Sequence, residues 1–307
     1  MVERHSVLRT LFLVEKRQQP LQIVRKHCDL PWKYQDLRQL DPTEQQQYLD
    51  SLLQTERHLG FQLNQAPLMR CYLIQLSDQT YKFLWNRHHL LLDGWSQPII
   101  YQEVLTFYQA YSQGQNLDLP SPRPYQEYIV WLQQQNLSDA DSFWRRTLEG
   151  FTAPTPLIVD RPLAKDPPLS NQEQELYLSR ATTQGLQALG QQHNLTLSTL
   201  LQAAWAILLS RYSGESDVLF GVTVSGRPAS LSGVKNMVGL FINTLPLRVS
   251  IPDDVWILPW LKQLQQNQAQ LQDYAYSPLA DVQRMSDVPP GISLFESLIV
   301  FEKLSNQ

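Results

Sequence analysis

A proline-dense stretch near the middle of the chain limits its fold more than any other feature. Residues 152–168 contain five prolines, which are Pro154, Pro156, Pro162, Pro167 and Pro168. Proline has no amide hydrogen to donate and fixes its own φ, so this density excludes a continuous helix or a central strand. The stretch therefore predicts two domains, residues 1–160 and residues 161–307, with the boundary inside it.

Strands and helices are mixed on both sides of this stretch. Apolar residues that alternate with polar ones predict strands, and apolar residues at a spacing of three to four predict helices. The predicted elements of the first half are strands at 69–76 and 81–86, joined as a hairpin, and helices at 97–113 and 139–148. Those of the second half are strands at 174–178, 218–224 and 298–301, a helix at 183–193 and a second helix that Thr196 caps, that runs to Tyr212 and that Gly214 ends. The sequence thus predicts an α/β protein (α+β mixed) with two lobes.

Composition excludes several classes of protein. A chain of 307 residues with two cysteines has no disulfide framework, which favours a reducing compartment. We see no apolar run long enough to span a bilayer and no secretory leader at Met1. The net charge of -4 offers no general attraction to nucleic acid. We therefore predict a cytoplasmic protein that binds neither membrane nor nucleic acid.

One short run concentrates the chemistry, His88-His89-Leu90-Leu91-Leu92-Asp93-Gly94. It lies between the predicted strand at 81–86 and the predicted helix at 97–113. Such a junction presents side chains at the edge of a sheet, and the glycine permits a tight turn or the close approach of a substrate.

Three kinds of chemistry suit paired imidazoles to different degrees. A zinc site needs three or four ligands at favoured spacings, and the other histidines and the cysteines are scattered, so we predict no metal. A serine hydrolase would need a Gly-x-Ser-x-Gly elbow, which is missing. A neutral imidazole can accept a proton from an attacking amine or hydroxyl, so acyl transfer to such a nucleophile fits best.

Several segments in order resemble condensation domains of nonribosomal peptide synthetases, which belong to the chloramphenicol acetyltransferase-like superfamily. Residues 88–94 match the family's His-His-x-x-x-Asp-Gly signature. Residues 4–12 resemble its Arg-His-x-x-Leu-Arg-Thr-x-Phe segment, and residues 125–131 resemble its Tyr-x-Asp-Tyr-x-x-Trp segment. Residues 238–248 resemble its Gly-x-Phe-x-Asn-Thr element, so the resemblance spans the chain.

The resemblance implies a fold, an activity and partners. The fold would be two acetyltransferase-like lobes that meet in a V-shaped pseudo-dimer. The activity would be amide-bond formation between a donor acyl or peptidyl thioester and the α-amine of an acceptor aminoacyl thioester. Both substrates would arrive on phosphopantetheine arms of upstream and downstream peptidyl carrier domains, beside an adenylation domain, and the domain itself would bind no cofactor.

The resemblance also implies roles for single residues. His89 would be the catalytic residue, acting as base, as orienter of the amine or as stabiliser of the tetrahedral species. His88 would be structural, and Asp93 would hold the loop by an ion pair with Arg4 or, second, with Arg9; either arginine could instead lie on a solvated helix face.

Four further residues would line the path of the substrate. Gly94 would lie on the substrate channel, and Trp95, Ser96 and Asn243 would lie in the substrate cleft. The alternative for Trp95 is core packing, and the alternative for Asn243 is a satisfied turn residue.

Two departures from the family predict that this chain is a fragment, truncated at both ends. The family has a motif before residues 4–12, and a further motif should follow Phe301-Glu302. The strand at 298–301 would then lack its sheet neighbours, so we expect the chain alone to aggregate or to show little activity.

Four rival functions share this fold, and two of them stay open. An epimerization domain would carry a Val-Ser-Trp-Arg pattern after the signature, and a cyclization domain would replace the histidines with aspartates; this chain does neither. An acyltransferase that uses free coenzyme A and a non-catalytic carrier-protein docking or gatekeeping domain stay open.

Overall fold

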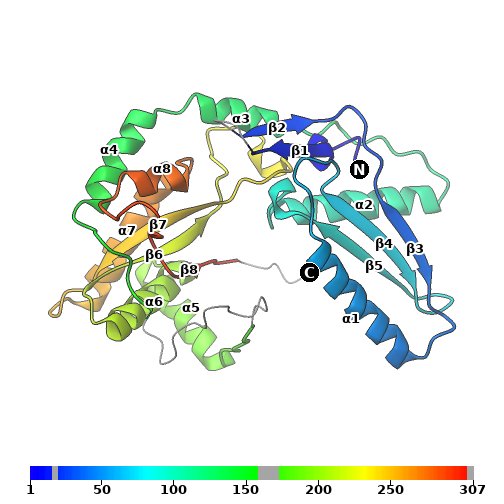
Figure 1. Ribbon diagram of the computed structural model, residues 1–307. Coiled ribbons are helices and arrows are strands. Elements are labelled where there is room, and N and C mark those ends of the chain that lie inside the picture. Colours follow the sequence, from blue (N-terminus) through cyan, green and yellow to red (C-terminus); the bar gives the residue numbers. More distant parts are fainter. Residues whose placement is uncertain (16–19, 158–172, 303–307) are drawn as a thin grey trace. The chain divides into compact units, whose positions relative to one another are not determined.

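The structure is a computed structural model that describes residues 1–15, 20–157 and 173–302 (Figure 1). Its contacts divide the chain into two units, one of residues 1–134 and 227–241 and the other of residues 135–226 and 242 onward. The expected boundary at 160/161 therefore differs from the observed division in two places. Residues 135–157 belong to the second unit because Phe143 and Trp144 pack in its core, and residues 227–241 return to the first unit.

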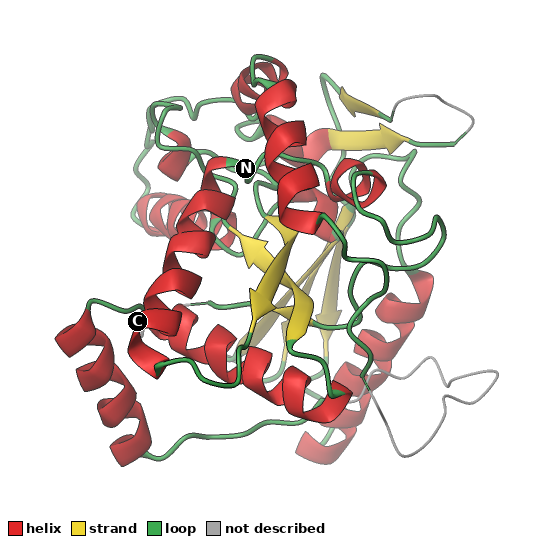
Figure 2. Ribbon diagram, turned by 90° about the vertical axis from the view of Figure 1, so that its left-hand side faces the viewer, coloured by secondary structure: helices red, strands yellow, loops and turns green. Residues whose placement is uncertain are grey.

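Strands and helices both occur in each of the two units, and loops join them (Figure 2). The strands of the first unit are β1 (Thr10–Leu13), β2 (Leu21–Val24), β3 (Trp32–Asp36), β4 (Met69–Gln75) and β5 (Tyr81–Arg87). Its α-helices are α1 (Pro42–Leu59), α2 (Ser96–Ser112) and α3 (Gln126–Gln133), and its short 3-10 turns are η1 (Ser6–Arg9), η2 (His89–Leu91) and η3 (Val234–Asn236).

A three-stranded sheet of order β3-β4-β5 organises the first unit. Strands β4 and β5 form the predicted antiparallel hairpin, and β3 pairs with β4 in parallel. Helix α1 packs on one face of this sheet, against Tyr72 and Ile74, while Tyr101 of α2 lies against Trp85 on the other face (Figure 1). Since β5 ends at Arg87, the sheet delivers the two histidines directly to the start of η2.

The second unit has three strands and five α-helices in the part of the chain that the structure describes. The helices are α4 (Leu137–Leu148), α5 (Arg180–His193), α6 (Leu197–Ser213), α7 (Ile257–Asp273) and α8 (Leu279–Arg284). The strands are β6 (Asp217–Val224), β7 (Asn243–Ser250) and β8 (Leu298–Ile299), in the sheet order β7-β6-β8.

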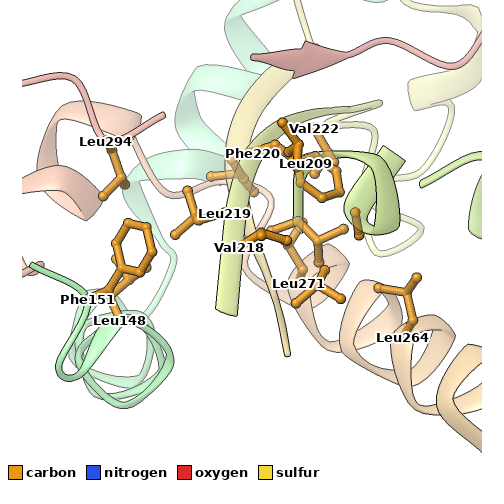
Figure 3. Packing of buried hydrophobic residues seen from close by; sticks show 14 of the residues in the cluster. Leu148, Phe151, Leu209, Val218, Leu219, Phe220, Val222, Leu264, Leu271 and Leu294 are labelled. Atoms are coloured by element: carbon orange, nitrogen blue, oxygen red, sulfur yellow. The ribbon is translucent and has the colours of Figure 1, made fainter. Parts of the chain in front are cut away.

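Strand β6 is the centre of the second unit's core (Figure 3). Leu219 points toward Phe151 and Leu294, while Val218 points to the opposite side, toward Leu271 of α7. Burial on both faces explains why this segment is a continuous apolar run rather than an alternating one, as the sequence predicts.

Most of the predicted elements are confirmed. The structure contains the predicted hairpin and the predicted strand at 218–224. The predicted helices at 97–113, 139–148 and 183–193 are present as α2, α4 and α5. Thr196 caps α6 by accepting a hydrogen bond from the Thr199 amide, and Gly214 ends it in the left-handed conformation. Residues 152–157 form no helix or strand, and the rest of the proline-rich stretch lies outside the described residues.

Two predicted strands differ from the structure. The strand at 174–178 is wrong, because its apolar side chains Leu176 and Tyr177 stay exposed and no described strand pairs with it. The last strand is present as β8 at residues 298–299, but the expectation that it lacks sheet neighbours is wrong. It pairs with β6 in parallel, and Phe295 and Leu298 pack over Gly221, where a side chain would leave no room.

Candidate functional site

The histidine-containing loop joins β5 to α2 in the first unit. Residues 89–91 form the 3-10 turn η2, and the side chains of Leu91 and Leu92 are buried in an apolar cluster with Ile100 of α2. Burial of the two leucines anchors the loop to the core of the first unit. The polar residues on either side of them are therefore held in a defined conformation.

His88 caps the turn that carries its neighbour. Its Nδ1 accepts a hydrogen bond from the Leu90 amide at 3.1 Å, and its ring lies edge-on to Phe61. Burial, with a smaller contribution from His89, lowers the pKa of His88 below its usual 6.5. A neutral ring with an unprotonated Nδ1 is the form that this cap requires.

His89 has the opposite surroundings. It is the first residue of η2 and its side chain is exposed. Among the residues that the structure describes, none forms a hydrogen bond or an ion pair with its imidazole. Both ring nitrogens are therefore available to another molecule.

Asp93 is buried and fully engaged. Its Oδ1 accepts hydrogen bonds from the amide and the hydroxyl of Ser96 at 2.8 and 2.7 Å, and its Oδ2 accepts one from the Phe241 amide at 3.0 Å. The remaining donor is the Arg227 guanidinium, 3.2 Å from Oδ1. The expected partners Arg4 and Arg9 are therefore wrong for Asp93, because Arg227 reaches this carboxylate from the segment that returns to the first unit.

Arg227 joins the loop to that returning segment. Its side chain is 4% exposed and donates to the Val234 and Met237 carbonyls as well as to Asp93 and Ser96. Burial lowers its pKa, although the Asp93 carboxylate opposes that change. Its Nε is a buried donor for which the structure gives no acceptor. The sequence signal for this residue is its place between Gly226 and Pro228, directly after the buried strand β6.

Ser96 and Gly239 complete the group that we call the Asp93 cluster, made of Asp93, Ser96, Arg227 and Gly239. The Ser96 hydroxyl lies 2.9 Å from the Gly239 carbonyl and accepts from the Gly239 amide at 3.1 Å. Because Ser96 is 0% exposed and its hydroxyl is taken up by the cluster, its expected place in the substrate cleft is wrong. It holds the first turn of α2 instead.

An aromatic group holds the returning segment in place. Tyr125 donates to the Leu240 carbonyl at 2.5 Å, and its ring lies edge-on to Phe241. Tyr128 packs against the same Phe241, with Val234 and Met237 in the same buried cluster. Residues 125–131 and 238–241, which carry two of the family-like segments, therefore meet in one core.

Arg4 supports the site indirectly. Its guanidinium binds both oxygens of Glu103 on α2 at 3.0 Å, and His5 approaches the same carboxylate at 2.6 Å. Two backbone carbonyls, of Leu119 and Pro120, accept its other hydrogens. Arg4 therefore ties the N-terminal segment to the middle of α2, because the acid nearest to it is Glu103 and not Asp93.

Arg9 binds the backbone and no carboxylate among the described residues. It donates to the carbonyl oxygens of Val2 and Arg25, at 3.3 and 2.5 Å. Its effect is to join the residues before η1 to the end of β2.

Gly94 and Trp95 form the exposed end of the loop. The Trp95 ring is 54% exposed, and its Nε1 donates to the Lys235 carbonyl at 3.0 Å. This bond holds the indole while leaving its ring open to another molecule.

Asn243 belongs to the second unit. Its Nδ2 donates to the carbonyls of Ala275 and Ser277, at 2.9 and 2.7 Å, and its Oδ1 accepts from the Thr244 amide. Both amide hydrogens are used within its own unit, so the structure gives Asn243 the turn-holding role rather than a free side chain in a cleft.

A cavity of about 470 Å³ lies in the second unit beside Arg248 and Asn267, and no predicted site residue lines it. Among the described residues, no group of three or more His, Cys, Asp or Glu side chains is placed to hold a metal ion. None of the described helices combines the length and the apolar character needed to span a membrane.

Comparisons with known proteins agree on one family. The family model described as "Condensation domain" matches residues 1–307. The chain is 46% identical over 307 residues to one of the linear gramicidin synthase proteins of Brevibacillus parabrevis, covering 99% of this chain and 6% of that protein. It is 43% identical over 306 residues to chondramide synthase cmdD of Chondromyces crocatus, covering 98% of this chain and 8% of that protein. The chain thus spans only a small part of the length of these relatives.

Solved structures show the same fold. The X-domain from teicoplanin biosynthesis matches with a TM-score of 0.79 and 21% identity, over 97% of this chain and 67% of that one. The starter condensation domain of rhizomide synthetase RzmA matches with a TM-score of 0.74 and 21% identity, over 97% of this chain and 66% of that one.

Proposed function

Because this chain belongs to the condensation-domain family of nonribosomal peptide synthetases, we propose that it forms an amide bond between two carrier-bound substrates. The donor is an acyl or peptidyl thioester and the acceptor is an aminoacyl thioester. Upstream and downstream peptidyl carrier domains present them on phosphopantetheine arms, and an adjacent adenylation domain selects an amino acid. The domain supplies protein groups only and binds no cofactor of its own.

The contrast between His89 and its surroundings is the observation that carries this proposal. The imidazole is exposed and free of protein partners among the described residues, while the turn beneath it is fixed by the His88 cap and two buried leucines. A free polar group on a rigid turn is what positioning of a substrate requires.

The reaction itself needs one proton to move. The acceptor nitrogen bonds to the thioester carbonyl carbon, the carbon–sulfur bond breaks, and the amine proton passes to the departing sulfur. We expect His89 to accept that proton, or a hydrogen bond from the amine, through either ring nitrogen. An α-amine with a pKa near ~8 is partly neutral at pH 7, so orienting it contributes along with deprotonating it.

Asp93 takes no part in this proton movement. Its carboxylate oxygens are occupied by Ser96, Arg227 and the Phe241 amide, so no oxygen is left for an imidazole. The geometry thus supports His89 acting without a carboxylate partner, unlike the histidine of a Ser-His-Asp triad.

We expect Gly94 and Trp95 to meet the substrate, because both are exposed at the end of the loop. Gly94 has no side chain to obstruct the approach of a thioester to the exposed loop. The open Trp95 ring offers an apolar wall beside it.

A transfer assay with two labelled carrier proteins tests the proposal. One carrier holds a donor acyl group and the other an aminoacyl group, and the labelled product is followed by its carrier. Product on the acceptor carrier that depends on both loaded carriers supports condensation.

Two other outcomes would assign a different function to the fold. A mutant of the rhizomide synthetase starter domain was crystallised in complex with C8-CoA and Leu-SNAC. Acylation of the acceptor from coenzyme A alone would indicate that this chain is an acyltransferase that uses free coenzyme A. The teicoplanin X-domain forms a complex with OxyB, and carrier binding without transfer would indicate a docking or gatekeeping domain.

A further inference from the structure

A second buried polar group lies in the first unit, apart from the Asp93 cluster. Glu56 of α1 is 5% exposed and accepts hydrogen bonds from Arg70 and Asn86, each at 2.6 Å, and from the Tyr72 hydroxyl. Burial alone would raise the pKa of Glu56, but the hydrogen bonds from Tyr72, Asn86 and Arg70 together lower it. The ionised carboxylate therefore ties the end of α1 to both strands of the β4–β5 hairpin.

Arg70 extends this group toward the histidines. Its guanidinium donates to the Gly60 carbonyl at 3.0 Å, and its Cζ lies 4.1 Å from the centroid of the Phe61 ring. A planar cation at this distance is attracted to the face of the ring. Glu56 and Gly60 together hold the guanidinium in the plane that this contact needs.

Phe61 carries the contact to His88. The two ring centroids are 6.2 Å apart and the rings are nearly perpendicular, at 82°. His88 in turn accepts the Leu90 amide at Nδ1, at the turn whose first residue is His89. An unbroken series of contacts thus leads from Glu56 through Arg70 and Phe61 to the turn beneath the free imidazole.

We infer that Phe61 and Arg70 are positioning residues for His89, and that they act through the ring of His88. The inference rests on the proposed function, because it gives a reason why the orientation of His89 matters. The Phe61 ring limits rotation of His88 about its side-chain bonds, and the His88 cap limits the turn. Both residues thus act through other side chains and not on the substrate itself.

Substitution of Phe61 separates this role from simple packing. Phe61→Leu keeps an apolar side chain but removes the ring that meets both Arg70 and His88, whereas Phe61→Tyr keeps the ring. In the 307-residue chain we expect hydrogen exchange of the Leu90 amide to be about ten-fold faster with Phe61→Leu. We expect the single-turnover rate of condensation to fall about ten-fold, with the KM for the acceptor carrier unchanged. Phe61→Tyr should restore most of both.

One further variant tests Arg70, and two others serve as controls. Arg70→Lys keeps a charge beside Glu56 but loses the planar contact, and it should change both measurements in the same direction as Phe61→Leu. Phe83→Leu removes an exposed ring from the same hairpin, and Arg38→Lys alters a surface pair with Asp36. Neither control should change Leu90 exchange or the rate.

The outcomes decide the inference separately from the proposed function. Unchanged Leu90 exchange with Phe61→Leu overturns it, and so does faster exchange with a wild-type rate of condensation. A wild-type chain that is folded and monodisperse on size-exclusion chromatography, binds both loaded carriers and forms no dipeptide overturns the proposed function. Leu90 exchange then still supports or overturns the ordering of the turn by Phe61.

Discussion

Two aspartate–arginine pairs, one in each unit, have the same chemistry in different surroundings. Asp217 and Arg248 lie 2.6 Å apart with side chains 40% and 23% exposed, while Asp93 and Arg227 lie 3.2 Å apart with side chains 0% and 4% exposed. Each arginine also donates to two backbone carbonyls. The shorter distance would make the Asp217–Arg248 pair the stronger one. Water can replace the contacts of an exposed pair, however, whereas loss of one partner of a buried pair leaves an uncompensated charge inside the protein. Burial, rather than bond length, should decide which pair the fold depends on.

Asp93→Ala tests the buried pair and should have the largest effect on stability. It leaves the buried Arg227 guanidinium without its carboxylate counter-ion and the Phe241 amide without an acceptor, which costs about 3–5 kcal/mol of unfolding free energy. The midpoint of urea denaturation should fall accordingly. A variant with a wild-type midpoint and no condensation activity would show that Asp93 acts in the chemistry instead.

Gly239→Ala tests how tightly the returning segment is packed. A Cβ at this position would lie 2.1 Å from Cδ2 of Tyr125, whose hydroxyl is held by the Leu240 carbonyl. Overpacking of this kind costs about 1–3 kcal/mol. The matched control is Gly185→Ala in α5, where a Cβ meets nothing within 4 Å and should raise stability by about 0.5–1 kcal/mol. Equal urea midpoints for the two variants would contradict the packing described for residues 238–241.

Asp217→Ala tests the exposed pair of the comparison. Since water can solvate the freed Arg248, the loss should be about 1 kcal/mol or less. The same urea titration measures it beside Asp93→Ala. A loss as large as that of Asp93→Ala would break the distinction between the two pairs.

Mild acidification should have the smallest effect. Burial lowers the pKa of His5 and of His88 in the folded chain, so the unfolded chain binds more protons once the pH falls to about 6.5. The contribution of these residues to stability is complete above that pH and declines as the pH falls below it. The urea midpoint should therefore decrease between about pH 7.5 and 6, and by less in His88→Asn, whose side-chain oxygen can replace Nδ1. A midpoint that rises on acidification would contradict the burial of these rings.

Local patterns were sufficient to predict most of the fold. The hairpin before the histidines, the helix after them and the cap at Thr196 depend on spacing and on residue types within a few positions. The strand at 174–178 failed because alternation cannot show whether a pairing strand exists. The sequence did not predict that β8 pairs with β6, nor that residues 227–241 return to the first unit. Both features join segments that lie far apart in the chain.

The site divides in the same way. The loop of His88, His89 and Asp93 is continuous, so its signature predicts it, and the structure adds that His88 Nδ1 accepts the Leu90 amide. The partner of Asp93 lies 134 residues away along the chain, and nothing local marks Arg227 as that partner rather than Arg4 or Arg9. Ser96 and Asn243 were expected in a cleft because of their motifs, but both use their polar atoms to hold backbone, which only the structure reveals.

We propose that, within this loop, His89 acts in the reaction while Asp93 stabilises the fold. The most direct measurement is the single-turnover rate of amide formation for His89→Ala, with both carrier proteins loaded and the urea midpoint recorded in parallel. Loss of one positioned acid–base group should lower the rate by about 10²–10⁴ while the midpoint and carrier binding stay at wild-type values. A wild-type rate in this variant would show that His89 does not act in amide formation.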